Sequence, residues 1–270
     1  MRRLVACVSV AGAPGVTTLS LALAAAWPAV SVGEVRPVVL EADASGGDVA
    51  ARLGRAHTPG LLDVAAAARR THPGSLLTAV QELPFGVRAV LAPSGAGQCR
   101  AAVELLEADG GRMLRGDAPD IGTVIVDLGR VADLALDRGL VAWADAVVLV
   151  AGGGVDALAH VFACREALAG ADRAMVLAVV GPCPYPEREI ARALGLEHVV
   201  LVPQAPRSAG VLCGASAGQL RLAGWRRSAL ATAAERLGRR VLELLPAEPD
   251  FPGAQPAVAV SAGTGAPCGR

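Results

Sequence analysis

A glycine-containing loop near the start of the chain has the residue types of a phosphate-binding site. Residues Ala11–Thr18 contain Gly12 and Gly15 and end in Thr17 and Thr18. Glycines permit a close approach of the backbone, so N–H groups can surround a phosphate, and a following helix adds its positive N-terminal end. In loops of this layout a threonine at the Thr17 position supplies a hydroxyl ligand for Mg²⁺. The loop therefore predicts nucleotide chemistry.

Two carboxylates lie in a second glycine-rich segment. Glu41 and Asp43 follow the apolar run Val38–Leu40 and lead into a Ser-Gly-Gly turn. A carboxylate at such a strand end can polarise a water or hold a hydrated Mg²⁺. We expect a functional role for Asp43, whereas Asp48 is interpreted as the cap of the following helix.

The third segment is an apolar strand that ends in a carboxylate and a glycine. Thr123–Val126 is followed by Asp127, Leu128 and Gly129. We expect the Asp127 carboxylate to lie near Mg²⁺ and the Gly129 N–H to lie near a terminal phosphate. Each segment alone is modest evidence, but their order and spacing together favour a nucleotide site.

The loop lacks the lysine that a nucleoside-triphosphate loop carries before its threonine, because Val16 occupies that position. All 25 basic residues of the chain are arginine, and asparagine is absent. A bias in codon usage explains arginine at surface positions but not valine here, since arginine was available. Losing charge-assisted hydrogen bonds worth about 1.5–3 kcal/mol each weakens nucleotide binding. It weakens hydrolysis still more, because the missing charges act mainly on the transition state.

The composition is that of a cytoplasmic α/β protein. The 270 residues fit one large domain, and their net charge near zero argues against a broad nucleic-acid surface. The six cysteines have no metal-ligand spacing and are expected to be reduced thiols. No run of about 18 apolar residues occurs. A membrane-spanning helix is therefore not expected, and any membrane contact is expected to be indirect or weak.

Short continuous apolar runs alternate with helical segments along the chain. Continuous rather than alternating hydrophobicity is typical of strands buried on both faces, as in a parallel sheet. We therefore predict an α/β fold, a doubly wound and mostly parallel sheet with helices on both faces and ligands at the carboxyl ends of its strands. The predicted strands are Leu4–Val10, Val38–Leu40, Val87–Leu91, Thr123–Val126, Ala146–Val150, Met175–Val180 and Val199–Val202. The predicted helices are Leu19–Trp27, Pro59–Arg70, Ala101–Leu114, Asp156–Leu168, Glu187–Leu194 and Leu220–Leu245.

The two ends of this pattern define the predicted domain. Residues 1–245 are expected to form this domain. Residues 246–270 are rich in Pro, Gly and Ala and are expected to form a disordered tail.

Thr58 is predicted to cap one helix, and Pro59 is predicted to be its first residue. The last helix is amphipathic with a polar face of mixed charge, which favours packing onto the sheet over lying on a membrane.

These segments together resemble the MinD/ParA group of P-loop ATPases, including its TadZ/CpaE-like branch. Ala11–Thr18 matches the phosphate loop of the group, Glu41-Ala42-Asp43 its switch acids and Asp127-Leu128-Gly129 its magnesium-site strand. Pro203-Gln204-Ala205-Pro206-Arg207 resembles the segment that lies over the base. The resemblance covers roughly residues 1–245.

The resemblance implies an ATP-dependent dimeric switch that positions chromosomes, the division septum, or pilus and secretion assemblies. It implies ATP binding with weak or conditional hydrolysis, Mg²⁺ as the metal, a homodimer, and protein partners from a positioning, division or secretion system. No specific nucleic-acid site is expected. The residues assigned by resemblance are Gly12, Gly15, Val16, Thr17, Thr18 and Gly129 for nucleotide, Thr17 and Asp127 for the metal, and Asp43 for catalysis.

Three positions depart from the pattern of the group. The signature lysine that reaches the nucleotide of the other subunit corresponds to Ala11, and the loop lysine corresponds to Val16. The base-reading asparagine is replaced by Gly181-Pro182. Arg130 and Arg207 are the two cations that we consider as replacements for a lysine.

Two further hypotheses remain open. A non-hydrolysing scaffold would keep the fold and recruit protein partners without nucleotide. A metabolic ligase of the dethiobiotin-synthetase kind would share the fold. The ligase ranks last, because such enzymes also depend on the loop lysine and no substrate-binding constellation is visible.

Overall fold

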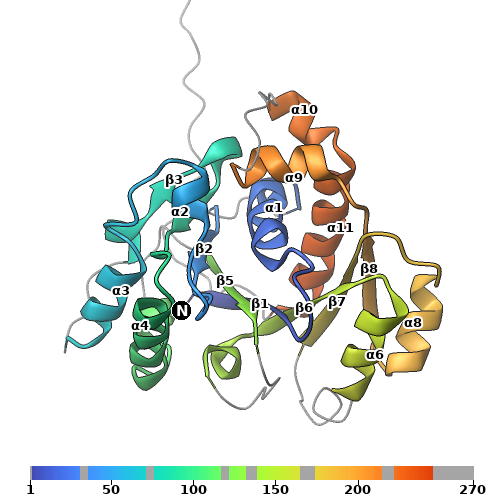
Figure 1. The fold of residues 1–270 in the computed structure, drawn as a ribbon, viewed down its shortest axis with the longest axis horizontal. Helices are drawn as coiled ribbons and strands as arrows, with labels where there is room; N and C mark the ends of the chain where they lie inside the picture. The colour runs from blue at the N-terminus through green and yellow to red at the C-terminus, as the bar shows by residue number, and fades with distance from the viewer. Residues whose placement is uncertain are drawn as a thin grey trace, which may run out of the picture.

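The computed structural model describes residues 2–30, 36–70, 76–116, 122–131, 139–164, 174–214 and 222–245. Within these residues the chain forms one sheet with helices on both of its faces (Figure 1). The predicted tail, residues 246–270, lies outside the described residues, so the domain boundary stays a prediction.

The sheet has eight strands in the order β3-β4-β2-β5-β1-β6-β7-β8. Neighbouring strands are parallel except β3 and β4, which pair antiparallel at one edge. Every predicted strand is present, which confirms the doubly wound, mostly parallel α/β architecture. Strand β3 was not predicted, because a strand of 2 residues leaves no periodicity in the sequence. The strands are β1 (Arg3–Ser9), β2 (Val38–Glu41), β3 (Gln81–Glu82), β4 (Arg88–Val90), β5 (Thr123–Arg130), β6 (Ala146–Gly152), β7 (Ala174–Val180) and β8 (His198–Val202).

Strand side chains alternate between two apolar cores, one on each face of the sheet. On β1, Leu4, Ala6 and Val8 belong to one core, and Val5 and Cys7 belong to the other. All five are buried. The continuous apolar runs in the sequence thus follow from burial on both faces, as in other parallel sheets.

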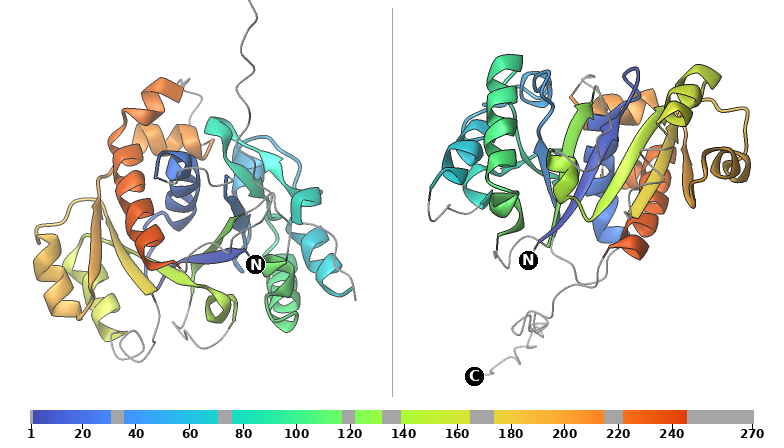
Figure 2. Two further views of the ribbon diagram at one scale, coloured as in Figure 1. Left: turned by 180° about the vertical axis from the view of Figure 1, so that it is seen from behind. Right: turned by 90° about the horizontal axis from the view of Figure 1, so that it is seen from below.

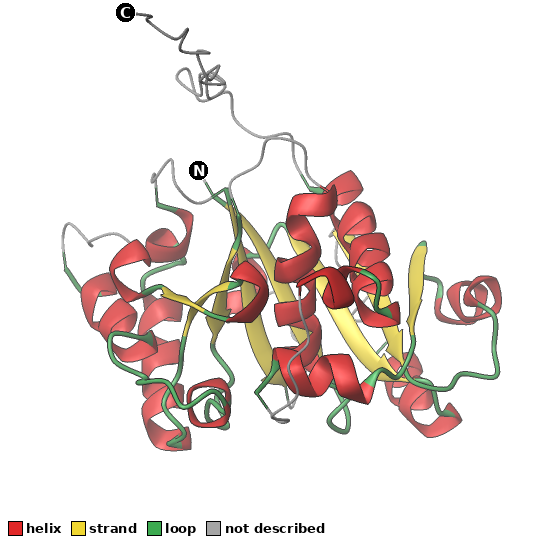
Figure 3. Cartoon of the chain, turned by 90° about the horizontal axis from the view of Figure 1, so that it is seen from above, coloured by secondary structure: helices red, strands yellow, loops and turns green. Residues whose placement is uncertain are grey.

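Two layers of helices cover these cores (Figures 2 and 3). In Figure 1, α1 lies beside α11 on one face, whereas α3 lies beside α4 on the other. The first core takes side chains from α3 (Leu61–Ala68), α4 (Ala96–Ala108), α5 (Arg112–Arg115), α6 (Val155–Ala163) and α8 (Glu187–Leu194). The second takes them from α1 (Val16–Val30), α2 (Val49–Arg52), α9 (Pro206–Leu212), α10 (Leu222–Arg226) and α11 (Ala229–Leu244). Short 3₁₀ turns lie at η1 (Leu76–Ala79), η2 (Pro84–Gly86) and η3 (Leu140–Trp143).

The prediction that Pro59 opens a helix was wrong. Helix α3 begins at Leu61 with Gly60 as its N-cap, and the Gly60 N–H donates to Asp63 Oδ2 at 2.8 Å. A Cβ on Gly60 would lie 2.2 Å from the His57 carbonyl oxygen, so the chain passes close to itself there. The close approach places the start of the helix after the proline.

Glycines and a serine cap divide two of the other predicted helices. The segment predicted as Ala101–Leu114 consists of α4 and α5, because Gly110 and Gly111 adopt φ values of +66° and +72° between them. The segment predicted as Leu220–Leu245 consists of α10 and α11, and Ser228 Oγ accepts the N–H of Ala231 at the start of α11. Of the helix predicted over Asp156–Leu168, the end beyond residue 164 lies outside the described residues.

The amphipathic character of α11 results from packing inside the molecule. Leu230, Leu237 and Val241 are buried in the second core, where α11 contacts α1, β7 and β8. This confirms that the helix packs onto the sheet. In the part of the chain that the structure describes, no helix is long and apolar enough to cross a membrane.

Glu41, at the end of β2, is a structural carboxylate. Its Oε1 accepts the N–H groups of Asp48 and Val49 at 2.9 and 3.1 Å, and its Oε2 accepts the N–H of Ala92 at 2.9 Å. The side chain is buried, which raises the pKa of its carboxyl, while the three N–H donors oppose that rise. Glu41 therefore fixes the start of α2 and does not face solvent as the expected switch acid would.

We predict that Glu41→Ala lowers the free energy of unfolding by about 2 kcal/mol or more, because an unsatisfied buried N–H costs about 1–3 kcal/mol. Urea unfolding followed by circular dichroism measures the change. Glu197→Ala removes a carboxylate that is 86% exposed and serves as the control, with an expected change within about 0.5 kcal/mol. A Glu41→Ala variant as stable as the control would contradict the structural role.

Candidate functional site

The three predicted segments meet because β2, β5 and β1 are neighbours in the sheet. Asp127 on β5 pairs in register with Cys7 on β1 and with Glu41 on β2. All three strands are parallel, so their carboxyl ends open at one edge of the sheet. The glycine loop follows β1, Asp43 follows β2, and Gly129 and Arg130 end β5. This edge is where ligands bind in open parallel sheets.

A cavity of about 500 Å³, which we call the phosphate cavity, occupies this edge. It brings together every residue predicted to contact nucleotide, and Asp43 as well. Asp127 does not line the cavity and is fully buried. The lining residues are Ser9, Gly12, Ala13, Pro14, Gly15, Val16, Thr17, Thr18, Asp43, Ser45, Asp48, Arg52, Gly129 and Arg130.

Backbone N–H groups of the loop and of α1 make this cavity favourable for an anion. Gly12 and Gly15 adopt φ values of +66° and +95°, which side-chain-bearing residues rarely tolerate. Helix α1 begins at Val16 and has no acidic residue in its first turn. Its unpaired N–H groups and the positive end of its dipole therefore face the cavity with no carboxylate in the first turn of the helix itself.

Asp127 has the features of a cation ligand. Its Oδ1 accepts the Gly129 N–H at 3.1 Å, and its Oδ2 is buried with no hydrogen-bond partner. Burial raises the pKa of the carboxyl from 3.8 to about 7, while Thr17 and the Gly129 N–H oppose the rise. A buried carboxylate with a free oxygen beside a threonine hydroxyl fits Mg²⁺, which takes hard oxygen ligands.

The side chains at this edge do not form a complete metal site. Among the described residues, no group of three or more His, Cys, Asp or Glu side chains is arranged to hold a metal ion. Mg²⁺ in nucleotide sites binds through one or two carboxylates together with phosphates and waters. The donor set here fits a Mg²⁺ ion that would take its remaining ligands from the phosphates of a nucleotide and from water.

A bulge at the end of β5 shapes the floor of the cavity. Asp127 pairs with Cys7 but Arg130 pairs with Ser9, so β5 contains one extra residue where Gly129 adopts φ +60°. A Cβ on Gly129 would lie 1.8 Å from Asp43 Oδ2. Only glycine fits at this point, and it allows the Asp43 carboxylate to lie directly over the backbone of β5.

The Asp43 carboxylate is anchored on one side and open on the other. Its Oδ1 accepts the N–H and the hydroxyl of Ser45 at 2.7 and 2.6 Å. Its Oδ2 lies over Gly129 at the cavity floor. This geometry suits a group that orients a water near a phosphate.

The residues at the lysine positions contribute no charge to the cavity. Val16 is only 5% exposed and packs in the second core, so its side chain continues the hydrophobic surface of α1. The basic side chains that line the cavity are Arg130 and Arg52, whereas Arg207 lines neither this cavity nor the one beside it.

Sequence reasoning missed Arg52. The signal available was its spacing of four residues from Asp48, which places both on one side of α2. Asp48 stands at the N-cap position of α2 as predicted, but its side chain makes no capping hydrogen bond. The Asp48 carboxylate pairs with Arg52 at 2.5 Å instead.

A second cavity of about 220 Å³ adjoins the phosphate cavity. The two share Ala13, Pro14, Gly15 and Thr18. The remaining lining residues are mostly apolar and come from α1, the ends of β7 and β8, the segment Pro203–Pro206, and helices α9 and α11. An apolar cavity joined to a phosphate cavity has the layout of a nucleotide site, with the base in the apolar part. Of the segment Pro203–Arg207, which the resemblance places over the base, the residues Pro203–Pro206 line this cavity and Arg207 does not, and its contact with a base stays a prediction.

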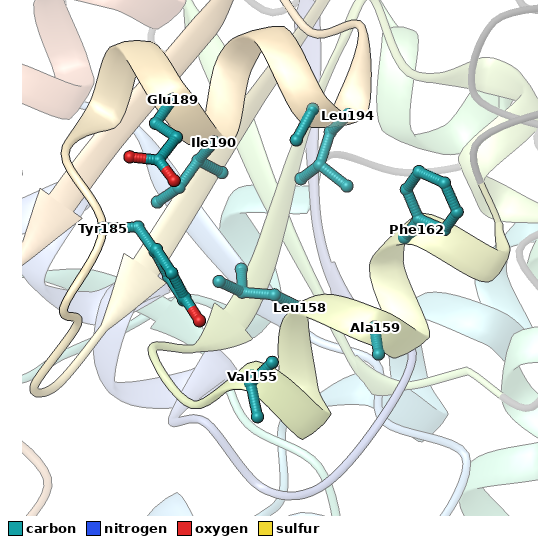
Figure 4. A pocket seen from close by; sticks show the side chains of 9 residues that line it. Val155, Leu158, Ala159, Phe162, Tyr185, Glu189, Ile190 and Leu194 are labelled. Atoms are coloured by element: carbon teal, nitrogen blue, oxygen red, sulfur yellow. The ribbon is translucent and has the colours of Figure 1, made fainter.

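A third cavity, of about 300 Å³, lies between α6 and α8 and shares no lining residue with the first two (Figure 4). Leu158 and Phe162 reach into it from α6, and Ile190 and Leu194 from α8. Its lining is apolar apart from Tyr185 and Glu189, and it contains no set of groups suited to phosphate or to a metal.

Comparison with solved structures identifies the fold. A ParA family ATPase from Chlorobium tepidum TLS matches with a TM-score of 0.66 and 18% identity, over 88% of this chain and 97% of that chain. The septum site-determining protein MinD complexed with Mg-ADP from Pyrococcus horikoshii OT3 matches with a TM-score of 0.64 and 17% identity, over 89% and 96%. The chain has the fold of the ParA and MinD ATPases. A chain of the MinC:MinD cell division complex from Aquifex aeolicus also matches, with a TM-score of 0.63 and 14% identity, over 92% and 99%.

No protein-family model and no curated protein matches the sequence. The likeness to the ParA/MinD structures therefore rests on backbone geometry, and identities of 14–18% establish the fold alone. One fold carries many functions, so function must be argued from the site.

We predict that Asp127→Asn stabilises the ligand-free protein at pH 8. The folded carboxyl holds its proton more tightly than the unfolded chain, so its contribution to stability is lost as pH rises from about 4 to 7. A shift from 3.8 to about 7 corresponds to about 4 kcal/mol at 1.36 kcal/mol per pH unit. Urea unfolding at pH 5 and pH 8 measures the gain, which should shrink at the lower pH.

The exposed Asp156 provides the control, since Asp156→Asn should show no such difference between the two pH values. An Asp127→Asn variant no more stable than the unmodified protein at pH 8 would show that the buried carboxylate is not a source of strain.

Proposed function

We propose that this protein is a MinD/ParA-like nucleotide-binding switch that positions cellular structures through protein partners. The observation that carries the proposal is the free, buried Oδ2 of Asp127 beside Thr17, below a cavity lined by the glycine loop. A buried carboxylate oxygen without a partner is costly, and a cation removes that cost. The adjoining apolar cavity supports a nucleoside triphosphate over a bare phosphate.

Each residue at the edge has a role in this proposal. Gly12, Gly15 and Thr18 bind the phosphates through the backbone, and Val16 contributes only its N–H. Thr17 and Asp127 hold Mg²⁺, which supplies positive charge to the phosphate oxygens when bound. Asp43 would orient the attacking water, and Gly129 would line the phosphate end of the site, where its N–H donates to Asp127 Oδ1 and not, as expected from the sequence, to a phosphate. The cofactors proposed are therefore ATP and Mg²⁺.

Hydrolysis is proposed to be slow or dependent on a partner. Transition-state charge is normally stabilised by positioned cations, and neither lysine position carries one here. We expect nucleotide binding to be retained without the two lysines, because the backbone N–H groups, the α1 dipole and the metal site do not depend on them.

The solved structures with this fold support a positioning role and protein partners. The MinD protein from Pyrococcus horikoshii binds Mg-ADP, and the MinD protein from Aquifex aeolicus forms a complex with MinC. By analogy we propose a homodimer that recruits partners of a chromosome-partitioning, septum-placement or pilus and secretion system. We propose a cytoplasmic location, with indirect contact at the inner face of the membrane.

One observation favours the alternative of a nucleotide-free scaffold. Val16 is packed in the core, so the lysine position has become part of the hydrophobic surface. A scaffold would associate with itself or its partners in the absence of any ligand.

We predict that calorimetry detects Mg²⁺-dependent ATP binding and that Val16→Lys tightens it about tenfold or more, because a lysine at this position adds one charge-assisted contact. Val16→Met is the control, since it matches the length of lysine without its charge. Asp127→Asn should abolish the dependence on Mg²⁺. Absence of binding at millimolar nucleotide in both the unmodified protein and Val16→Lys would refute the nucleotide site.

We predict further that the protein associates only with Mg-ATP present. Size-exclusion chromatography with light scattering should show a doubled mass in Mg-ATP, and Asp127→Asn should keep the monomer mass under the same conditions. Equal masses with and without nucleotide would instead support the scaffold.

A further inference from the structure

We propose that Arg52 is the phosphate-binding cation of this cavity and that Asp48 holds its side chain there until the polyphosphate displaces the carboxylate. The inference rests on the proposed nucleotide site and names the residue that replaces the missing lysine. It is carried by the position of Arg52 on α2, its ion pair, and the charges around the cavity.

The backbone of α2 is fixed at both ends. At its start, the buried Glu41 carboxylate accepts the N–H groups of Asp48 and Val49. At its end, the Arg52 carbonyl oxygen lies 2.6 Å from where a Cβ on Gly214 would be, so α2 is pressed against the segment after α9. The backbone that carries the Arg52 side chain is therefore held in place at both ends of α2.

The side chain reaches the phosphate cavity close to the first turn of α1. Arg52 lines the cavity together with Thr17 and Thr18. The Thr18 hydroxyl contacts Cys213 Sγ at 3.2 Å, and the positive charge of Arg52 lowers the pKa of Cys213 against a larger rise from burial. A cation is thus present on the side of the loop where the N–H groups of α1 are exposed.

The charges on the cavity wall require such a cation. Asp43 and Asp48 line the cavity, and Asp127 and Glu41 are buried below it. Among the lining residues, Arg52 and Arg130 provide the opposite charge. A polyphosphate entering this cavity meets carboxylates that repel it, which the arginines and a metal must offset.

The ion pair between Arg52 and Asp48 is suited to exchange. The two side chains are 42% and 65% exposed, and ion pairs of this kind contribute little to stability. A phosphate offers the planar guanidinium two parallel hydrogen bonds and more negative charge than one carboxylate. In the absence of ligand Asp48 keeps the side chain over the cavity, and phosphate then takes its place.

Binding of ATP, ADP and AMP to Arg52→Ala by calorimetry, with Mg²⁺ present, tests the proposal. We expect affinity for ATP to fall about 10- to 100-fold, corresponding to one lost charged contact. The loss should be smaller for AMP, which carries a single phosphate. Arg52→Lys should recover part of the affinity, because it keeps the charge but not the forked geometry.

Arg240→Ala is the matched control. Arg240 is 47% exposed and pairs with Glu243 on α11, so its removal deletes an equally exposed helical ion pair outside the cavity. ATP binding by the unmodified protein with equal affinity in Arg52→Ala and Arg240→Ala would overturn the inference and leave the proposed function standing. An unmodified protein that binds no ATP would overturn the proposed function itself.

Asp48→Asn tests the exchange separately, with thermal unfolding to confirm that each variant is folded. Removing the competing carboxylate should tighten ATP binding several-fold, and the gain should be absent from the double variant Asp48→Asn with Arg52→Ala. A gain that persists in the double variant would show that Asp48 repels phosphate independently and does not act through Arg52.

Discussion

The insertion of β5 between β1 and β2 brings the candidate site together. β5 comes later in the chain than either neighbour, yet its pairing places Asp127 level with Cys7 and Glu41. Parallel pairing then places three strand ends at one edge, so the glycine loop and Asp43 line a single cavity with Asp127 buried next to it. Without this pairing the three segments would be separate and each would be chemically ordinary.

Two buried carboxylates on adjacent strands serve opposite purposes because their surroundings differ. Glu41 is saturated by three backbone N–H groups and fixes the start of α2. Asp127 accepts one N–H and leaves its second oxygen free, so it retains the capacity to bind a cation. The saturated carboxylate organises the site, and the unsaturated one gives the site its proposed chemistry.

The positive charge of this site lies at other positions than in phosphate loops that carry a lysine. Helix α1 and the glycine turns preserve the backbone cradle, while Val16 joins the core and contributes no charge. Positive charge enters instead from Arg52 on α2 and Arg130 at the end of β5. Side chains that lie on the wall of a cavity can neutralise phosphates without being placed to stabilise a transition state, which is why we propose nucleotide binding with slow hydrolysis.

Seven of the eight strands, the doubly wound class and the loop could be predicted from local patterns, because burial on both faces and the strand-glycine-helix order leave strong signals in the sequence. What each carboxylate does depends on long-range packing. Glu41 and Asp43 are two residues apart, yet one is buried against backbone donors and the other lies over Gly129. Arg52 belongs to the site for the same reason, since the contact of α2 with the segment after α9 cannot be read from a local pattern. Local sequence sets what a segment can form, whereas long-range packing sets which groups meet.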